Sequence, residues 1–357
     1  PDADIVYQCE YPQFIDITNS TLGSVIFCNM YFIGSADSGK PLINASGTSN
    51  VFVLNSTFKN IGHACIFNTT SNGDNGNILV KGCAFYKCKH PVYLNGNNSS
   101  VRDNVFEKSG YYWQSGYAVF MLRGKNFYIG YNTIKDFTYS AIFVSGGTNA
   151  DQTGNTGIIE YNTIETVDWD TDYIEHQLID SGAIQISIVN SPVIVRHNFI
   201  NNYKTRKSGR GIMMGGNCSQ ISIYKNLITN IPSFSAIDFY KGSEKNQYYP
   251  NGVEDLLMYN IVEGCIRMVG GNDFTDYPSY AKDDNDCVCG YNLIGDTGYN
   301  MSNQSLQKSI SDVPYLEMPI IDDSFSYKDK GHILLSHDVS SWNLSDFIMG
   351  KLQLSIK

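Results

Sequence analysis

Three charged residues stand next to strand-like segments where they could act together. Asp180 directly precedes the segment Ser-Gly-Ala-Ile-Gln-Ile, and Asp238 lies within the similar segment Ala-Ile-Asp-Phe. If such segments stack as strands, these two carboxylates are two repeats apart, about 10 Å along the stack. Carboxylates about 6.5–9.5 Å apart suit an inverting glycosidase, in which one protonates the leaving oxygen and the other activates water. The alternative is that each carboxylate caps a turn or forms a surface ion pair.

Basic residues near this pair could position an acidic sugar or stabilise developing charge. Arg210 enters the segment between the two carboxylates, and Lys241 and Arg267 follow later in the chain. His176 is a reserve acid–base group and substrate contact, together with Glu175. The sequence therefore predicts Asp180, Asp238 and Arg210 as catalytic candidates.

A lyase is a second interpretation of the same region, because a lyase needs a base beside a carboxylate neutralised by a metal. Lys204, Arg206 and Lys207 form a basic cluster with Arg210, and the acidic loop 167–180 could hold calcium through Asp168, Asp170 and Asp172. Solvated turns are the alternative for both segments. No other metal and no firm cofactor is expected, since the sequence lacks a zinc pattern, a phosphate loop and a serine-hydrolase elbow.

Successive segments of this type predict an outward-facing column. Each begins with a small residue followed by apolar, variable and apolar positions, as in Ala-Ile-Phe-Val at 141–144. Side chains alternate between the two faces of a strand, so the third position of every segment points the same way. Aromatic rings in this column would stack on sugar rings, or long loops would cover them as a second small core. The column contains Ile66, Tyr93, Phe120, Phe143, Gln185, Met213, Asp238 and Arg267.

A recurring Asn organises the segments that must position these residues. An apolar residue is followed three positions later by a pivot residue, usually Asn, and two positions after that by another apolar residue. Successive pivots are 21 to 36 residues apart, which is the spacing of a solenoid. The flanking alternation has period two and predicts strands, while Asn suits a tight bend and could form a ladder between coils. The pivots are Asn29, Ser56, Cys83, Asn104, Asn132, Asn162, Asn198, Asn226, Asn260 and Asn292.

The segments Tyr-Asn-Thr-Ile, His-Asn-Phe-Ile and Lys-Asn-Leu-Ile resemble those of right-handed parallel β-helix proteins. This solenoid occurs in pectate lyases, several glycoside hydrolases, phage tailspikes and many surface adhesins, and the resemblance covers roughly residues 20–300. It implies an all-β fold of about ten coils and leaves the activity open, because function lies in a site added to the coil. We expect a β-helix at 1–300 and an irregular cap at 301–357, where the Asn pivot disappears.

The composition narrows the class of partner. The chain has 357 residues and a net charge of −10, which argues against nucleic acid, and 25 tyrosines suit contact with sugars or proteins. The sequence contains no run of 18 apolar residues, so no membrane-spanning helix is predicted. The chain begins at Pro1 without Met, so we expect a mature or excised segment of a secreted or surface protein. Most of the nine cysteines are expected in the core, with disulfides between neighbouring coils as the alternative.

Glycosylation sequons also favour an extracellular location. Ten occur, at Asn19, Asn44, Asn55, Asn68, Asn97, Asn98, Asn217, Asn300, Asn303 and Asn343. Two functions therefore remain open. One is a protein that binds and cleaves polysaccharide along the outward column, and the other is a structural or adhesive β-helix that forms a homo-oligomer or filament.

Overall fold

The architecture is known from a computed structural model. It describes residues 5–8, 15–17, 23–34, 39–47, 49–69, 77–111, 116–146, 155–167, 181–202, 209–215, 218–231, 235–240, 255–258, 260–263, 266–269, 287–290, 292–295 and 332–335. All secondary-structure elements in these ranges are β-strands. The described part therefore contains no helix that could cross a membrane.

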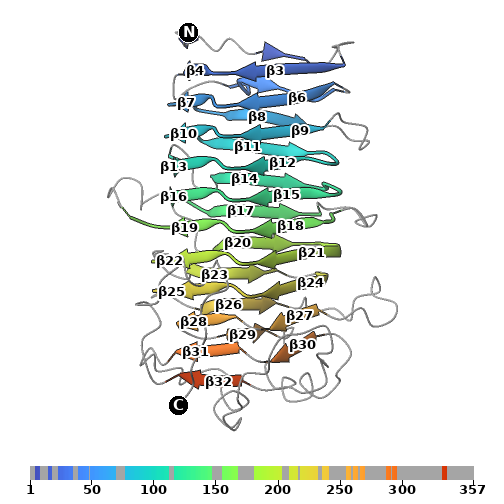
Figure 1. Cartoon of the computed structure of the whole chain (residues 1–357), viewed down its shortest axis with the longest axis vertical. Coiled ribbons are helices and arrows are strands. Elements are labelled where there is room, and N and C mark those ends of the chain that lie inside the picture. Colours follow the sequence, from blue (N-terminus) through green and yellow to red (C-terminus); the bar gives the residue numbers. More distant parts are fainter. Residues whose placement is uncertain are drawn as a thin grey trace.

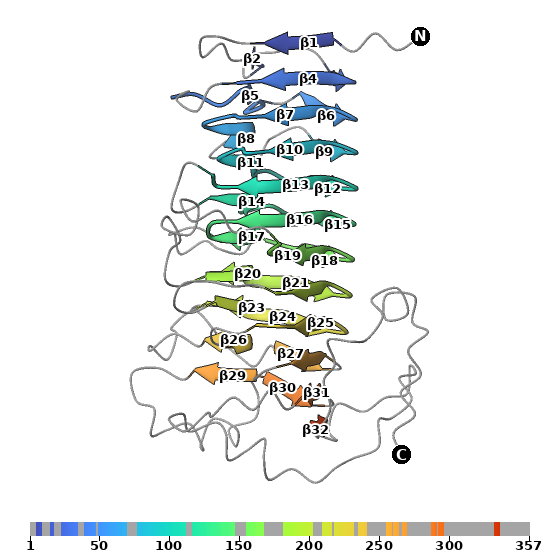
Figure 2. The ribbon, with the colours of Figure 1, turned by 90° about the vertical axis from the view of Figure 1, so that its left-hand side faces the viewer.

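The strands form three parallel sheets, and the chain visits sheets B, C and A in turn. Each strand pairs with the strand one coil later (Figures 1 and 2). Sheet A contains β1 (Ile5–Gln8), β4 (Met30–Ile33), β7 (Thr57–Lys59), β10 (Ala84–Tyr86), β13 (Val105–Ser109), β16 (Thr133–Phe137), β19 (Thr163–Glu165), β22 (Phe199–Asn201), β25 (Leu227–Thr229), β28 (Ile261–Glu263), β31 (Asn292–Gly295) and β32 (His332–Leu335). Sheet B contains β2 (Ile15–Asp16), β5 (Ile43–Asn44), β8 (Ala64–Thr69), β11 (His90–Asn95), β14 (Tyr117–Leu122), β17 (Ser140–Ser145), β20 (Ser181–Ser187), β23 (Gly209–Met214), β26 (Ser235–Tyr240) and β29 (Ile266–Val269). Sheet C contains β3 (Ser24–Cys28), β6 (Asn50–Leu54), β9 (Ile78–Lys81), β12 (Ser100–Arg102), β15 (Phe127–Gly130), β18 (Gly157–Glu160), β21 (Asn190–Arg196), β24 (Ser219–Tyr224), β27 (Asp255–Met258) and β30 (Cys287–Gly290).

The apolar positions three residues before and two residues after the pivots from Asn132 to Asn226 are buried and stack on like neighbours. On sheet C, Ile129 pairs with Ile159, and Ile159 with Val195. The other such positions of these coils are equally inaccessible: Ile134, Ile164, Ile200, Ile223 and Ile228. At the N-terminal end of sheet A the same inward column is a stack of phenylalanine rings 4.7–4.9 Å apart: Phe32, Phe58, Phe85 and Phe106.

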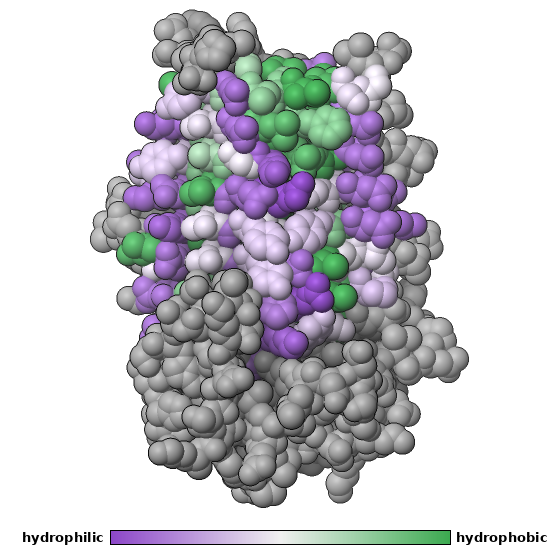
Figure 3. All heavy atoms as spheres, in the orientation of Figure 1, coloured by the Kyte–Doolittle hydropathy of each residue, from purple (hydrophilic) through white to green (hydrophobic). Residues whose placement is uncertain are grey.

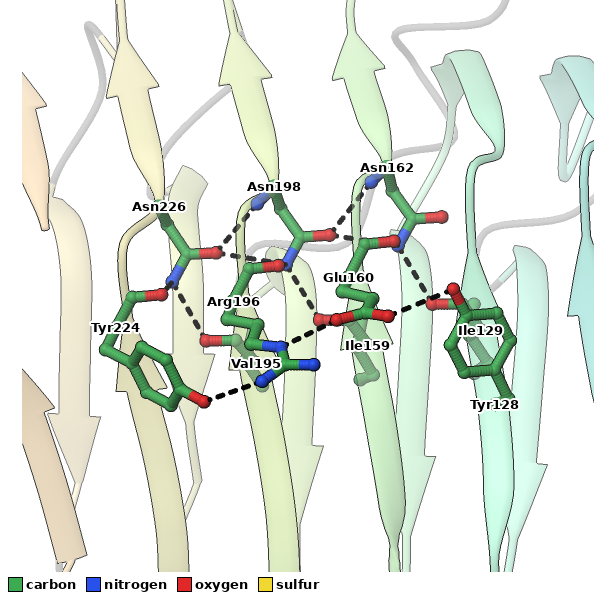
Figure 4. Close-up of polar contacts among 10 residues, drawn as sticks. All are labelled: Tyr128, Ile129, Ile159, Glu160, Asn162, Val195, Arg196, Asn198, Tyr224 and Asn226. Carbon is green, nitrogen blue, oxygen red and sulfur yellow. Dashed lines mark hydrogen bonds and ion pairs between the residues drawn. The ribbon is translucent and has the colours of Figure 1, made fainter. Parts of the chain in front are cut away.

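The Asn pivots form a buried ladder at the turn from sheet C to sheet A (Figure 4). The side-chain amide of Asn132 donates to Asn162 Oδ1 at 2.9 Å, and that of Asn162 donates to Asn198 Oδ1 at 2.9 Å. The ladder continues from Asn104 at one end to Asn260 at the other. Each amide also bonds to backbone carbonyls, so the ladder satisfies polar groups that the turn would otherwise bury unpaired.

Two details of the predicted pivots need correction. The left-handed residue of the turn is the one before the pivot, as at Tyr131 (φ 57°) and Tyr161 (φ 54°), so Asn is selected for its hydrogen bonds. In the first coil the pattern was misaligned by one residue. Asn29 has φ 55° itself, and Met30 occupies the pivot position and donates to Ser56 Oγ at 3.1 Å.

The C-terminal segment adds a strand to the stack. Residues 332–335 form β32, which pairs in parallel with β31 in the register Leu293 to Ile333. The rest of the predicted cap at 301–357 lies outside the described ranges, so the division at residue 300 stays a prediction. The five cysteines whose side chains are described form no disulfide: Cys65, Cys83 and Cys88 are buried, Cys218 is half-buried and Cys28 is exposed.

Candidate functional site

The outward column on sheet B begins one residue later than predicted. Tyr93 pairs with Phe67, not with Ile66, which is buried in the core. From Tyr93 onward the register is as expected, since Tyr93 pairs with Phe120 and Phe120 with Phe143. The column then continues through Gln185, Met213, Asp238 and Arg267.

A second row of rings packs beside the column. Tyr117 lies 5.0 Å from Phe120 and 5.2 Å from Phe143, measured between ring centroids. Within the column, Tyr93 and Phe120 are 4.5 Å apart and Phe120 and Phe143 are 5.1 Å apart. We call this continuous surface the aromatic strip, and it consists of Phe67, His90, Tyr93, Tyr117, Phe120, Tyr139 and Phe143.

The strip is only partly open to solvent. Phe120 is 8% exposed, which differs from the expectation of an accessible ring, whereas Tyr93 and Phe143 are half-buried. The cause is the second row, in which Tyr117 covers Phe120. Burial raises the pKa of Tyr117, with a further contribution from Tyr139, so its hydroxyl stays protonated and can donate a hydrogen bond. The strip therefore offers half-buried rings bordered by phenol groups.

Polar residues continue the strip on the following coils. Gln185 is buried, accepts a hydrogen bond from Ser140 Oγ at 3.0 Å and donates to Tyr139 Oη at 3.4 Å. On the coil after Gln185, the guanidinium Nε of Arg210 donates to Asp238 Oδ2, which lies one coil further, in an ion pair. The side chain of Arg210 is 8% exposed and that of Asp238 is 1% exposed. The predicted approach of Arg210 to Asp238 is thus present, but the pair is enclosed.

Several predicted site residues cannot be placed. Asp180, His176 and Lys241 lie outside the described residues, as do Glu175, the acidic loop at 168–172 and the basic cluster at 204–207. Arg267 is placed by its backbone, which pairs with Asp238 on β26. Among the described residues no group of three or more His, Cys, Asp or Glu side chains could hold a metal ion.

The sequons that are described differ in accessibility. Asn68 is fully buried and its amide nitrogen donates to the carbonyl of Ala45 at 3.0 Å, which leaves no room for a glycan in the folded chain. Asn55 and Asn98 are exposed at positive φ, and Asn44 and Asn97 are half-buried. The remaining sequon asparagines lie outside the described ranges.

The second ring row was not predicted, although the sequence carries a signal for it. His90 and Tyr117 each stand directly before the small residue that opens the aligned segment, Pro91 or Ala118. Tyr139 stands one residue further upstream, directly before β17 (Ser140–Ser145). The ring contacts of His90, Tyr117 and Tyr139 with the column place them on the outward face, which alternation counted from the third position alone does not predict.

A comparison with protein families agrees with this architecture. The family described as the right handed beta helix region matches residues 41–253. This match covers more than half of the chain, so the chain belongs to that family. No curated protein and no solved structure matches the chain.

Acid should destabilise the strip through His90. Burial, together with the nearby charges of Lys89 and His63, lowers the pKa of His90 to about 3. Neutral His90 contributes its full stabilisation above pH 6.5, which is about the pKa of histidine in the unfolded chain. This contribution is lost as the pH falls toward 3, at about 1.4 kcal/mol per pH unit. Urea unfolding at pH 7, 6, 5 and 4 should include this slope, in addition to that of His197, whose pKa burial lowers to about 4. His90→Phe keeps the ring and should reduce the slope by the His90 share, and an unchanged slope in that variant would contradict the assignment.

Proposed function

We propose that this β-helix binds an extended polysaccharide along the aromatic strip of sheet B. The observation that carries the proposal is the continuous contact of rings over four consecutive coils, with Tyr93 and Phe143 half-exposed. Aromatic faces are electron-rich and attract the C–H groups of a sugar ring, while phenol hydroxyls bond to the sugar hydroxyls. Partly exposed apolar surface of this extent is typical of binding sites.

Binding without cleavage is the form of this function that we favour. An acid or base in glycoside hydrolysis must reach the substrate, and Asp238 is 1% exposed with Oδ2 bonded to Arg210. The chain would then serve as an adhesive or structural glycan-binding β-helix, outside the cell or on a surface, alone or as a homo-oligomer or filament. Cleavage is the second candidate, because Arg210 and Asp238 continue the strip on the same sheet.

Binding can be tested by affinity electrophoresis against neutral and acidic linear polysaccharides. We expect retardation by at least one of them, and a loss of affinity of about tenfold, or 1.4 kcal/mol, in Tyr93→Ala and Phe143→Ala. Tyr86→Ala is the matched control, because Tyr86 is a half-buried tyrosine on sheet A. Equal loss in the control, or no retardation at all, would overturn the proposal. Release of reducing ends that stops in Asp238→Asn would favour the second candidate.

A further inference from the structure

Sheet C carries a second surface of tyrosines and charged groups, on a different face from the aromatic strip. Figure 3 shows this face: polar side chains lie along its middle, and apolar side chains gather over β3, β6 and β9. One outward column runs from Arg102 through Gly130, Glu160 and Arg196 to Tyr224, with each residue paired to the next coil. The side chains of this column are therefore about 4.8 Å apart along the axis.

Tyr128 lies along the sheet because its strand has a glycine two residues later. A Cβ atom at Gly130 would lie 2.5 Å from the Tyr128 hydroxyl oxygen and 2.6 Å from Cζ. The ring thus passes directly over Gly130, and its hydroxyl reaches the next coil and donates to Glu160 Oε1 at 3.1 Å (Figure 4). Tyr128 remains half-buried in this position, so part of the ring stays open to solvent.

Glu160 joins Tyr128 to the two coils that follow. Its Oε2 accepts from Arg196 Nε at 2.6 Å, and Arg196 Nη1 donates to the Tyr224 hydroxyl at 3.1 Å. Burial opposes the charge on Arg196, but the Tyr224 hydroxyl and the Glu160 carboxylate raise its pKa. The Glu160 side chain is 10% exposed and that of Arg196 is 32% exposed, so the further N–H groups of Arg196 are the ones open to a ligand.

A ladder of rings stands beside this network at the turn toward sheet A. Tyr131 and Tyr161 stack at 4.9 Å with an angle of 11°, and Tyr161 and His197 stack at 4.9 Å with an angle of 5°. All three have φ of 54–57°, a conformation that disfavours bulky side chains. The equivalent positions on earlier coils are Asn55, Gly82 and Asp103, which adopt it more readily, and Lys225 on the next coil has φ 54° as well.

The left-handed conformation recurs at this turn from Asn55 to Lys225, so it belongs to the coil and is not specific to the three ring-bearing residues. What distinguishes these three consecutive coils is that they place rings at this turn in register. Ring stacking offsets part of the cost of this conformation, but Tyr131 is 52% exposed and therefore contributes little to the core. The exposed ring is better explained by a ligand than by packing. We call the whole surface the tyrosine patch, and it consists of Tyr128, Tyr131, Glu160, Tyr161, Arg196, His197 and Tyr224.

We infer that the tyrosine patch binds a linear, uncharged glycan that lies along the solenoid axis. The solenoid rises about 4.8 Å per coil, which is close to the length of one pyranose unit, so successive sugars would meet successive coils. Tyr128 and Tyr224 provide ring surfaces, and Arg196, which Glu160 holds in place, provides donors for sugar hydroxyls. Glu160 and Arg196 neutralise each other within the patch, whereas Arg102 and Lys225 lie near enough to interact with Tyr128 and His197. An acidic probe therefore tests whether these two basic residues favour an acidic glycan. The inference shares only the class of ligand with the proposed function, since the two surfaces lie on different sheets.

Hydroxyl-radical footprinting of the intact chain can test the two surfaces separately. The probes are a neutral linear polysaccharide, galactomannan, and an acidic one, polygalacturonate. With galactomannan we expect severalfold lower oxidation of Tyr128, Tyr131 and Tyr224, whereas polygalacturonate should leave them unchanged. Protection of Tyr93 and Phe143 reports on the aromatic strip in the same experiment.

Gly130→Ala provides the decisive variant. The added methyl group displaces the far end of the flexible Tyr128 side chain, so the chain should stay folded while the ring leaves its position. We expect protection of the tyrosine patch to disappear and protection of the aromatic strip to persist. Gly23→Ala is the matched control, because nothing lies within 4 Å of a Cβ atom there. Tyr131→Ala removes an exposed ring and should also weaken patch protection if Gly130→Ala fails to fold.

Each outcome decides the inference. Patch protection by galactomannan that is lost in Gly130→Ala supports it. Protection by polygalacturonate alone, or protection that rises with protein concentration in the absence of glycan, overturns it in favour of an acidic glycan or self-association. Protection of Tyr93 and Phe143 alone overturns it and leaves the proposed function standing. Protection of neither surface overturns both.

Discussion

Replacing Asn162 by Ala is expected to lower the free energy of unfolding by about 3–5 kcal/mol. The variant loses five hydrogen bonds: two that Asn162 Oδ1 accepts from Asn132, and three that its amide donates to Ile129, Glu160 and Asn198. The backbone N–H of Asn132 then stays buried without this acceptor, and an unsatisfied buried donor costs about 1–3 kcal/mol by itself. Urea unfolding followed by circular dichroism measures the loss.

Two further variants define what the ladder contributes. Asn50→Ala removes an exposed bond to the backbone N–H of Asn77 and should cost less than about 1 kcal/mol. Asn162→Ser should be intermediate, because Ser56 already fills a pivot and accepts the N–H of Met30. If Asn162→Ala costs no more than Asn50→Ala, the ladder does not stabilise the solenoid.

The sequence predicted the coil well because its signals are local and repeated. The apolar position three residues before each Asn pivot faces inward, so Ile129, Ile159 and Val195 fall into one column without knowledge of any contact. The pivot register failed at the first coil, where Asn29 takes the left-handed position and Met30 the pivot position. The outward column failed on the next coil, where Phe67 and not Ile66 precedes Tyr93. Repetition corrects such errors in the middle of a solenoid and cannot do so at its ends.

The candidate site was predicted less completely. It depends on the side-chain conformations and on the contacts that the side chains make, whereas the sequence pattern gives only the face of the strand from which each side chain projects. Period-two alternation placed Tyr93 and Phe143 outward, but it could not show that Tyr117 covers Phe120. It also gave no indication that Gly130 allows Tyr128 to reach Glu160. The Tyr128 contact crosses 32 residues of sequence, and only the three-dimensional arrangement brings the two groups together.

The second large effect concerns the ion pair between Arg210 and Asp238. Removing one member of a buried pair leaves the other charge poorly compensated, which costs about 3–5 kcal/mol. We therefore expect Asp238→Asn and Arg210→Met each to unfold at a much lower urea concentration. The double variant Arg210→Met/Asp238→Leu should recover much of the loss, since apolar residues of similar size remove both desolvation costs.

Assays of the same variants also separate the two functions proposed for the strip. If the pair only holds β23 and β26 together, each single variant loses stability, and glycan affinity falls only as far as the fold does. If Asp238 is also a catalytic group, Asp238→Asn loses stability for the same reason, because the buried guanidinium of Arg210 is left unpaired in either case. The parent chain would then release reducing ends from its polysaccharide, and the Asp238→Asn variant, assayed under conditions in which it is still folded, would not. Release of reducing ends by the parent chain and its loss in folded Asp238→Asn therefore distinguish a hydrolytic β-helix from an adhesive one.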